Sequence, residues 1–216
     1  AGAIIFGVPV GILTAVFMAY YCPKKIYKPL KAATELLAGI PSVVYGFFGL
    51  VVIVPVIRTL GRDLGFGGNG SNILTASILL GMMILPTIIG LTESSVRAVP
   101  EQYYEGAVAL GATHERAIFR VVIPAAKSGV VAAIVLGVGR AIGETMAVIM
   151  VAGNQARMPA GIFRGVRTLT ANIVIEMGYA TGLHREALIA TGVVLFVFIL
   201  IINFCVAVLK RRTSHE

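Results

Sequence analysis

An arginine and a glutamate lie inside a long apolar run of the sequence, where two charges are costly. Arg140 and Glu144 both fall in the stretch from Ser128 to Ala152. If this stretch is one helix, Arg140 lies about 18 Å from its start, near the middle of a bilayer. Each charge costs about 2.5 to 3.5 kcal/mol at that depth, and a pair four residues apart recovers only about 0.2 to 0.5 kcal/mol. The two charges therefore either bond to neighbouring helices or serve an anion, to which a guanidinium offers several donors.

The composition assigns the chain to the membrane proteins. Of its 216 residues, 57% are hydrophobic and 13% are charged, which excludes a disordered chain and a soluble enzyme with a polar shell. The formal charge of +8 comes from cations at the ends of apolar runs, a pattern of membrane topology rather than of nucleic-acid binding. The cysteines and histidines lack the spacing of a metal site, so we expect no bound metal.

Five apolar runs are long enough to cross the bilayer, since about 20 helical residues span its hydrocarbon core. None alternates apolar and polar residues as a barrel wall would. The sequence therefore predicts an all-α, polytopic transmembrane helical bundle that forms a single domain over residues 1–216. The predicted spans are Ala3 to Tyr21, Leu36 to Ile57, Asn72 to Thr92, Ser128 to Ala152 and Ala187 to Leu209.

The cations are divided unequally between the two sides of these spans. By the positive-inside rule the side with eleven cations is cytoplasmic and the side with six is external, which puts the amino end outside and the carboxyl end inside. Because Ala1 begins almost within an apolar run and is not Met, we expect at least one earlier span before it. The eleven are Lys24, Lys25, Lys28, Lys31, Arg97, Arg116, Arg120, Lys127, Lys210, Arg211 and Arg212, and the six are Arg58, Arg62, Arg157, Arg164, Arg167 and Arg185.

Glycine and proline punctuate several of the predicted spans. The residues Gly39 to Ser42 and Pro55 interrupt the second span, which predicts either a broken helix or a proline kink packed against neighbours. Glycines four residues apart also allow close contact between helices in lipid. The two such pairs are Gly7 with Gly11 and Gly139 with Gly143.

The segment 93–127, between the third and fourth spans, is neither apolar enough to span nor rich enough in Gly and Ser to be a tether. Pro100 can open a helix over residues 101–110, and Gly111 permits a turn. A second short helix is predicted over residues 113–122, before Pro124. Apolar residues at helical spacing leave one face of this segment to bury against the bundle or a partner.

This segment resembles the EAA loop of ABC importer permeases in residue type and spacing. The residues that carry the resemblance are Glu105, Gly106, Ala107, Gly111, Val121, Val122, Ile123 and Pro124. Gly106 replaces the middle alanine of the usual motif, Val121 an isoleucine and Ile123 a leucine. Residues 38–46, 140–145 and 168–173 resemble the phosphate-specific branch of that family, and residues 144–154 resemble the first of its two sister permeases.

The resemblance implies a permease subunit that carries inorganic phosphate across a prokaryotic inner membrane. It would pair with a homologous sister permease, with two ATPase subunits that dock at the 101–124 segment, and with an external phosphate-binding protein. ATP and Mg would be held by the ATPases, so this chain would bind no cofactor. The implied translocation path includes Arg140, Glu144, Thr145, Ser42 and Tyr45. The implied external contacts to the anion or the binding protein are Arg157, Arg164 and Arg167.

On that path Arg140 would bind phosphate oxygens, and Glu144 would accept the proton of monohydrogen phosphate, which sulfate lacks at neutral pH. Glu93 is a further candidate for the cavity wall. The chain has no phosphate-cradling GxxxxGK loop, and its GxGxxG match at residues 65–70 follows no strand, so we interpret it as a turn. No catalytic set stands out, and we expect a transporter subunit rather than an enzyme. The alternatives are a permease for molybdate, sulfate or phosphonate, and an intramembrane enzyme acting on lipid phosphates, which would leave the EAA-like segment unexplained.

Overall fold

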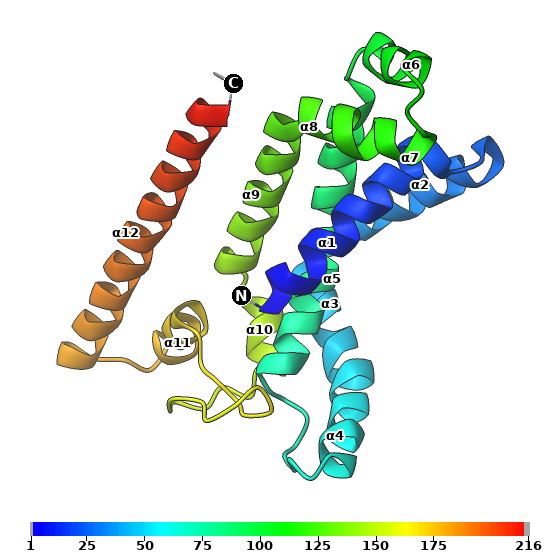
Figure 1. Cartoon of the computed structure of the whole chain (residues 1–216). Coiled ribbons are helices and arrows are strands. Elements are labelled where there is room, and N and C mark those ends of the chain that lie inside the picture. The colour runs from blue at the N-terminus through cyan, green and yellow to red at the C-terminus, as the bar shows by residue number, and fades with distance from the viewer. Residues whose placement is uncertain (1, 214–216) are drawn as a thin grey trace.

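The computed structural model describes residues 2–213, with side chains through residue 204. This part of the chain consists of helices and loops with one isolated backbone bridge, which confirms the all-α prediction. Figure 1 shows α5 in the middle of the bundle, with α6 to α8 beyond one of its ends and the loops after α4 and α10 beyond the other. The helices are α1 (Gly2–Val16), α2 (Lys24–Gly39), α3 (Ser42–Phe48), α4 (Val54–Asp63), α5 (Ile73–Arg97), α6 (Glu101–Ala109), α7 (His114–Ala117), α8 (Ile123–Ala125), α9 (Lys127–Gly143), α10 (Met146–Val151), α11 (Leu169–Glu176) and α12 (Gly182–Thr213).

Helix α5 forms the core of the bundle and packs against α1 on one side. Glycines on α1 let the two backbones approach closely. A Cβ atom on Gly7 would lie 2.7 Å from a side-chain atom of Ile84, and one on Gly11 would lie 2.7 Å from Ile88. The predicted close contact through Gly7 and Gly11 is therefore confirmed.

Helix α9 packs against α5 through a different set of small residues from the predicted one. Gly139 and Gly143 make no close contact within the described chain, because nothing lies within 4 Å of a Cβ at either position. The contact runs through Gly137, whose Cβ would lie 2.9 Å from Ile88, and through the fully buried Ala133. These residues lie on another face of α9, and spacing alone does not say which face meets the core.

The predicted second span, Leu36 to Ile57, is wrong at both ends. Helix α2 stops at Gly39, and the membrane span runs from Ser42 to Asp63. Ile40 is extended (ψ 127°) because the ring of Pro41 disfavours helical angles at the preceding residue. The predicted break at residues 39–42 is thus confirmed.

At Pro55 the second span continues, so the broken helix, one of the two predicted alternatives, is not found there. A π-helical turn, Gly49–Ile53, precedes Pro55 and the helix continues. Two further π-helical turns, Phe17–Tyr21 and Ile118–Val122, also end two residues before a proline. Proline has no N–H to bond the carbonyl four residues back and its ring collides with that carbonyl, so a widened turn accommodates it.

The predicted fourth span, Ser128 to Ala152, is wrong as one helix. Helix α9 ends at Gly143, Glu144 is extended (ψ 126°), and α10 begins at Met146. The helical stretch that ends at Ala125 meets α9 at an angle of 72°. Among the residues that the structure describes, four other helices are long and apolar enough to cross a membrane: Gly2–Tyr21, Ser42–Asp63, Ile73–Arg97 and Gly182–Phe204. A fifth span is reached by counting the bent pair as one.

Helix α12 stands to one side of the bundle, next to α9 and α11 (Figure 1). Most of its apolar side chains up to Phe204 are exposed. Because α12 is long and apolar, this exposure fits a helix surrounded by lipid or by another membrane subunit.

Candidate translocation path and coupling segment

The break between α9 and α10 carries the two charges that the sequence places inside the membrane. Arg140 lies in the last turn of α9, where the negative end of the helix dipole favours a cation. Glu144 lies beyond that end, and its Oε1 accepts the Ala147 N–H of α10 at 3.1 Å. The charges therefore do not share one helix face as an i,i+4 pair. Opposite ends of two helices accommodate them instead.

Arg140 keeps its hydrogen-bonding capacity. Its side chain is exposed on the isolated chain, and it makes no hydrogen bond or ion pair with the side chains described, those of residues 2–204. Its charge acts on the Tyr45 hydroxyl of α3, so the two side chains lie on the same side of the break. A guanidinium without a protein partner can bind an anion through several donors.

Helix α3 brings Ser42 and Tyr45 to this break. It packs against α10 so tightly that a Cβ on Gly46 would lie 2.9 Å from the Ala147 backbone. Tyr45 is buried, and its hydroxyl donates to the Leu37 carbonyl at 2.9 Å, which ties α3 to the end of α2. Ser42 opens α3 and is half-buried. The structure thus brings all five predicted path residues to one region, since Thr145 directly follows Glu144.

The loop 153–168, which the sequence predicts to be external, contains the three predicted contact arginines, and these differ in their surroundings. Arg167 donates from Nη1 to Glu176 at 2.7 Å and from Nε to the Asn154 carbonyl at 3.1 Å, so it clamps the loop to α11. Among the described residues, the Arg157 side chain bonds only its near neighbour Gln155, at 3.0 Å. The side chain of Arg164 makes no hydrogen bond or ion pair within the described residues. Arg157 and Arg164 thus keep donors for an external partner, whereas Arg167 is engaged within the chain.

Glu93 lies in a buried polar cluster rather than on an open cavity wall. Its side chain is 1% exposed and accepts from the Tyr27 hydroxyl at 2.6 Å, from Lys31 Nζ at 3.2 Å and from Arg97 Nε at 2.8 Å. Arg97 also donates to the Met18 carbonyl at 2.9 Å. The hydrogen bond to Glu93 raises the pKa of the Lys31 amine above its ordinary value. One carboxylate thereby joins α2 and the end of α1 to α5.

The cluster also explains why α5 continues beyond the predicted end of its span at Thr92. The charge of Glu93 is neutralised by partners, so the helix extends to Arg97. Sequence reasoning missed these partners. The i,i+4 spacing of Glu93 and Arg97 was the only local signal.

The EAA-like segment, residues 93–127, is called the coupling segment below. It contains a pair of short helices around a glycine, as predicted. Helix α6 ends at Ala109, and Gly111 has φ +85°, a backbone conformation that favours glycine. Thr113 caps α7 by accepting the Arg116 N–H. A Cβ on Gly106 would meet nothing within 4 Å, so the alanine of the usual motif would fit. Of the EAA-like residues, Glu105, Gly106, Gly111 and Pro124 are exposed, and Ala107 and Ile123 are half-buried.

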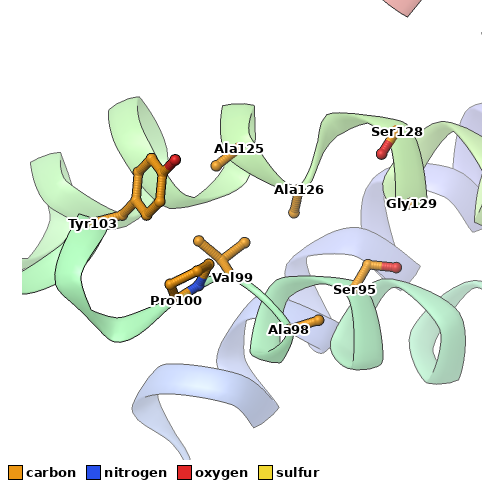
Figure 2. Close-up of a pocket in the computed structure, with 9 residues that line it drawn as sticks. All are labelled: Ser95, Ala98, Val99, Pro100, Tyr103, Ala125, Ala126, Ser128 and Gly129. Carbon is orange, nitrogen blue, oxygen red and sulfur yellow. The ribbon is translucent and has the colours of Figure 1, made fainter. Parts of the chain in front are cut away.

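A cavity of about 390 Å³ lies where the coupling segment joins the bundle. Figure 2 shows Val99, from the linker between α5 and α6, pointing towards Ala125 and Ala126 at the bend between α8 and α9. Ser95, Tyr103 and Ser128 are also among its lining residues. The cavity thus lies at the base of the segment, between the α5–α6 linker and the start of α9.

Residues 7–215 match the family described as "Binding-protein-dependent transport system inner membrane component". The chain belongs to this family. Together with its apolar helices, this identifies a multi-pass inner-membrane protein. The sequence-based identification of an importer permease is confirmed.

Curated relatives of this family member are similar over most of its length. "Phosphate transport system permease protein PstC" of Mesorhizobium japonicum is 38% identical, and the match covers 93% of this chain and 66% of the relative. "Probable ABC transporter permease protein YqgH" of Bacillus subtilis is 41% identical, with 91% and 64% covered. The PstC of Haemophilus influenzae is 35% identical, with 90% and 67% covered. The chain thus spans about two thirds of the length of these relatives.

Solved structures share the fold of this family member at low sequence identity. An inward-facing structure of the MetNI methionine ABC transporter aligns with a TM-score of 0.75 at 21% identity and covers 98% of this chain and 89% of its own. A bacterial alginate ABC transporter in complex with a substrate-bound periplasmic protein aligns with a TM-score of 0.69 at 18% identity, covering 97% and 74%. Both support the permease fold for this helical bundle.

Proposed function

We propose that the chain is a membrane-spanning subunit of an ATP-driven importer of inorganic phosphate, the first of two sister permeases. The observation that carries this proposal is Arg140, a cation at the break between α9 and α10 with donors that the described chain does not use. The similarity to permeases named for phosphate transport supports phosphate over molybdate, sulfate or phosphonate.

In this function Arg140 binds phosphate oxygens at the break, and Glu144 recognises the proton of monohydrogen phosphate. Oε1 of Glu144 already accepts the Ala147 N–H, so Oε2 receives the phosphate proton as a hydrogen bond. Sulfate brings no such proton and meets the carboxylate with like charge, which disfavours it. Ser42, Tyr45 and Thr145 line the same stretch of the path.

The 93–127 segment and the carboxyl end face the cytoplasm in this proposal, and the amino end of the chain faces outside. One permease domain, residues 1–216, then presents residues 101–124 to two ATPase subunits, with Glu105 to Ala107, Gly111 and Ile123-Pro124 at the contact. Those subunits hold ATP and Mg, and this chain binds no cofactor. A homologous sister permease completes the path within the lipid, and an external phosphate-binding protein docks near Arg157 and Arg164.

The test is phosphate uptake and ATPase activity of the assembled complex, reconstituted with its binding protein. Phosphate should stimulate ATP hydrolysis, whereas sulfate, molybdate and a phosphonate should not. R140Q should lower uptake at least about tenfold, because it removes charge-assisted hydrogen bonds worth about 1.5 to 3 kcal/mol each. R62Q, at the exposed end of α4, is the matched control. Unchanged uptake by R140Q, or stimulation by another oxyanion instead, would overturn the corresponding part of the proposal.

A further inference from the structure

A second, polar cavity of about 430 Å³ opens where α1 and α5 reach the end of the membrane. Tyr20 from the end of the α1 span, Arg97 from the end of α5, Glu101 and Tyr104 from α6 and His114 from α7 line it with Ala19 and Val99. The Tyr104 hydroxyl bonds Nδ1 of His114 at 2.7 Å, which fixes the imidazole ring. The cavity lies beside the segment proposed to meet the ATPases, but its lining residues are not those placed at that contact, Glu105 to Ala107, Gly111 and Ile123-Pro124.

The cavity contains one cation and one anion with unused hydrogen-bonding capacity. Arg97 donates from Nε to Glu93 and from Nη2 to the Met18 carbonyl, which leaves further N–H groups free on a side chain that is 45% exposed. The Glu101 side chain makes no hydrogen bond or ion pair within residues 2–204, whose side chains are described. Both charges act on the Tyr20 hydroxyl, so Arg97 and Glu101 both lie near it. Such a lining matches a ligand that carries an anion and a cation a few bonds apart.

An exposed apolar stripe on α1 leads to the cavity. Phe6, Val10, Leu13 and Phe17 are 44 to 57% exposed and recur at intervals of three and four residues, which puts them on one helix face. The next turn of that face is Tyr20 and Tyr21, and the Tyr21 ring lies 5.0 Å from the ring of His114. Because α1 is long and apolar enough to be a membrane span, acyl chains could pack along this stripe, and the polar cavity at its end would then lie at headgroup level.

We propose that this site binds one phospholipid with a phosphoethanolamine headgroup. The phosphodiester accepts hydrogen bonds from Arg97 and from Nε2 of His114, and the primary ammonium donates to Glu101. The acyl chains lie along the stripe from Phe17 to Phe6. A primary ammonium is favoured over a choline group because only the former can donate N–H bonds to the carboxylate. The site does not depend on which ion the complex carries.

The decisive comparison is E101Q against E35Q, a matched substitution at an exposed position of α2 outside the cavity. The assembled complex is delipidated and titrated with phosphatidylethanolamine, phosphatidylcholine and phosphatidylglycerol, and bound lipid is counted by native mass spectrometry. Wild type and E35Q should retain phosphatidylethanolamine in preference to the other two. E101Q should lose about two- to fivefold of that preference, the range for a partly exposed ion pair. Equal preference in E101Q and E35Q, or none in wild type, overturns the proposal.

Two further experiments test whether the bound phosphate group belongs to a lipid, and whether the acyl chains of that lipid lie along α1. Inorganic phosphate should not displace the bound lipid, and displacement at equal occupancy would mean a site for the free ion instead. Phosphatidylethanolamine with a photoreactive acyl chain should cross-link to residues 6–17. Cross-links confined to other helices, or to another subunit covering this face of α1, would also refute the proposal.

Discussion

Replacing Glu93 by glutamine tests whether one buried carboxylate holds the cytoplasmic-facing ends of α1, α2 and α5 together in the proposed orientation. The change keeps the shape of the side chain and an acceptor for the Tyr27 hydroxyl but removes the charge that faces Lys31 and Arg97. Removing one partner of a fully buried ion pair costs about 3 to 5 kcal/mol. Here Lys31 and Arg97 are 40% and 45% exposed and regain water, so we expect a loss of about 2 kcal/mol.

Thermal unfolding of the purified complex measures this loss. For a chain of this size 1 kcal/mol corresponds to about 2 to 4 °C, so E93Q should lower the Tm by roughly 4 to 8 °C. E35Q, on an exposed position of α2, controls for the loss of one negative charge. If E93Q unfolds at the same temperature as E35Q, the cluster does not hold the helices together and the reasoning from its geometry is refuted.

Three further predictions concern the packing of α1, the coupling segment and the charge of Lys31. G11L should destabilise the complex by about 1 to 3 kcal/mol because its side chain would collide with Ile88, whereas G139A should not, since its Cβ meets open space; thermal unfolding compares them. G106A should stabilise α6 by up to about 1 kcal/mol and leave phosphate-stimulated ATPase activity intact, and loss of that activity would contradict an open position there. Because the pKa of Lys31 is raised by folding, its charge stabilises the folded state fully below the ordinary pKa of 10.5, and this stabilisation is lost as the pH rises through the raised pKa. The Tm of K31M should therefore fall less than that of wild type between pH 10 and 12.

Hydropathy predicted most of the architecture because a bilayer demands long apolar helices whatever their tertiary contacts. It could not predict that α5 continues to Arg97, because Glu93 pairs with Lys31 and accepts a hydrogen bond from Tyr27, and both residues are distant in sequence. It also joined α9 and α10 into one span, since both are apolar and the break depends on backbone angles at Glu144. Both errors arose at a charged residue, where a distant partner or a helix end accommodates the charge. Hydropathy contains no information on either.

The candidate path could be predicted by residue type but not by geometry. Arg140 and Glu144 stood out because charges are rare in apolar runs, yet their separation by a helix break required the structure. Arg167 was expected among the external contacts, but its ion pair to Glu176 joins the loop to the end of α11. Spacing within a loop gives no information on which cation folds back onto its own chain.

The widened turn at Gly49–Ile53 sets the rotational phase of everything that follows it in the second span. Successive residues of an α-helix are rotated by about 100°, so a turn that holds one residue more than an α-helical turn re-aims α4 by that amount. The side of α4 that meets the bundle, with Val54, Ile57 and Gly61, is buried only in this phase. Deleting a single residue between 49 and 53 would leave composition and hydropathy almost unchanged yet turn this side towards lipid. Insertions and deletions in this stretch should therefore be tolerated far less than substitutions.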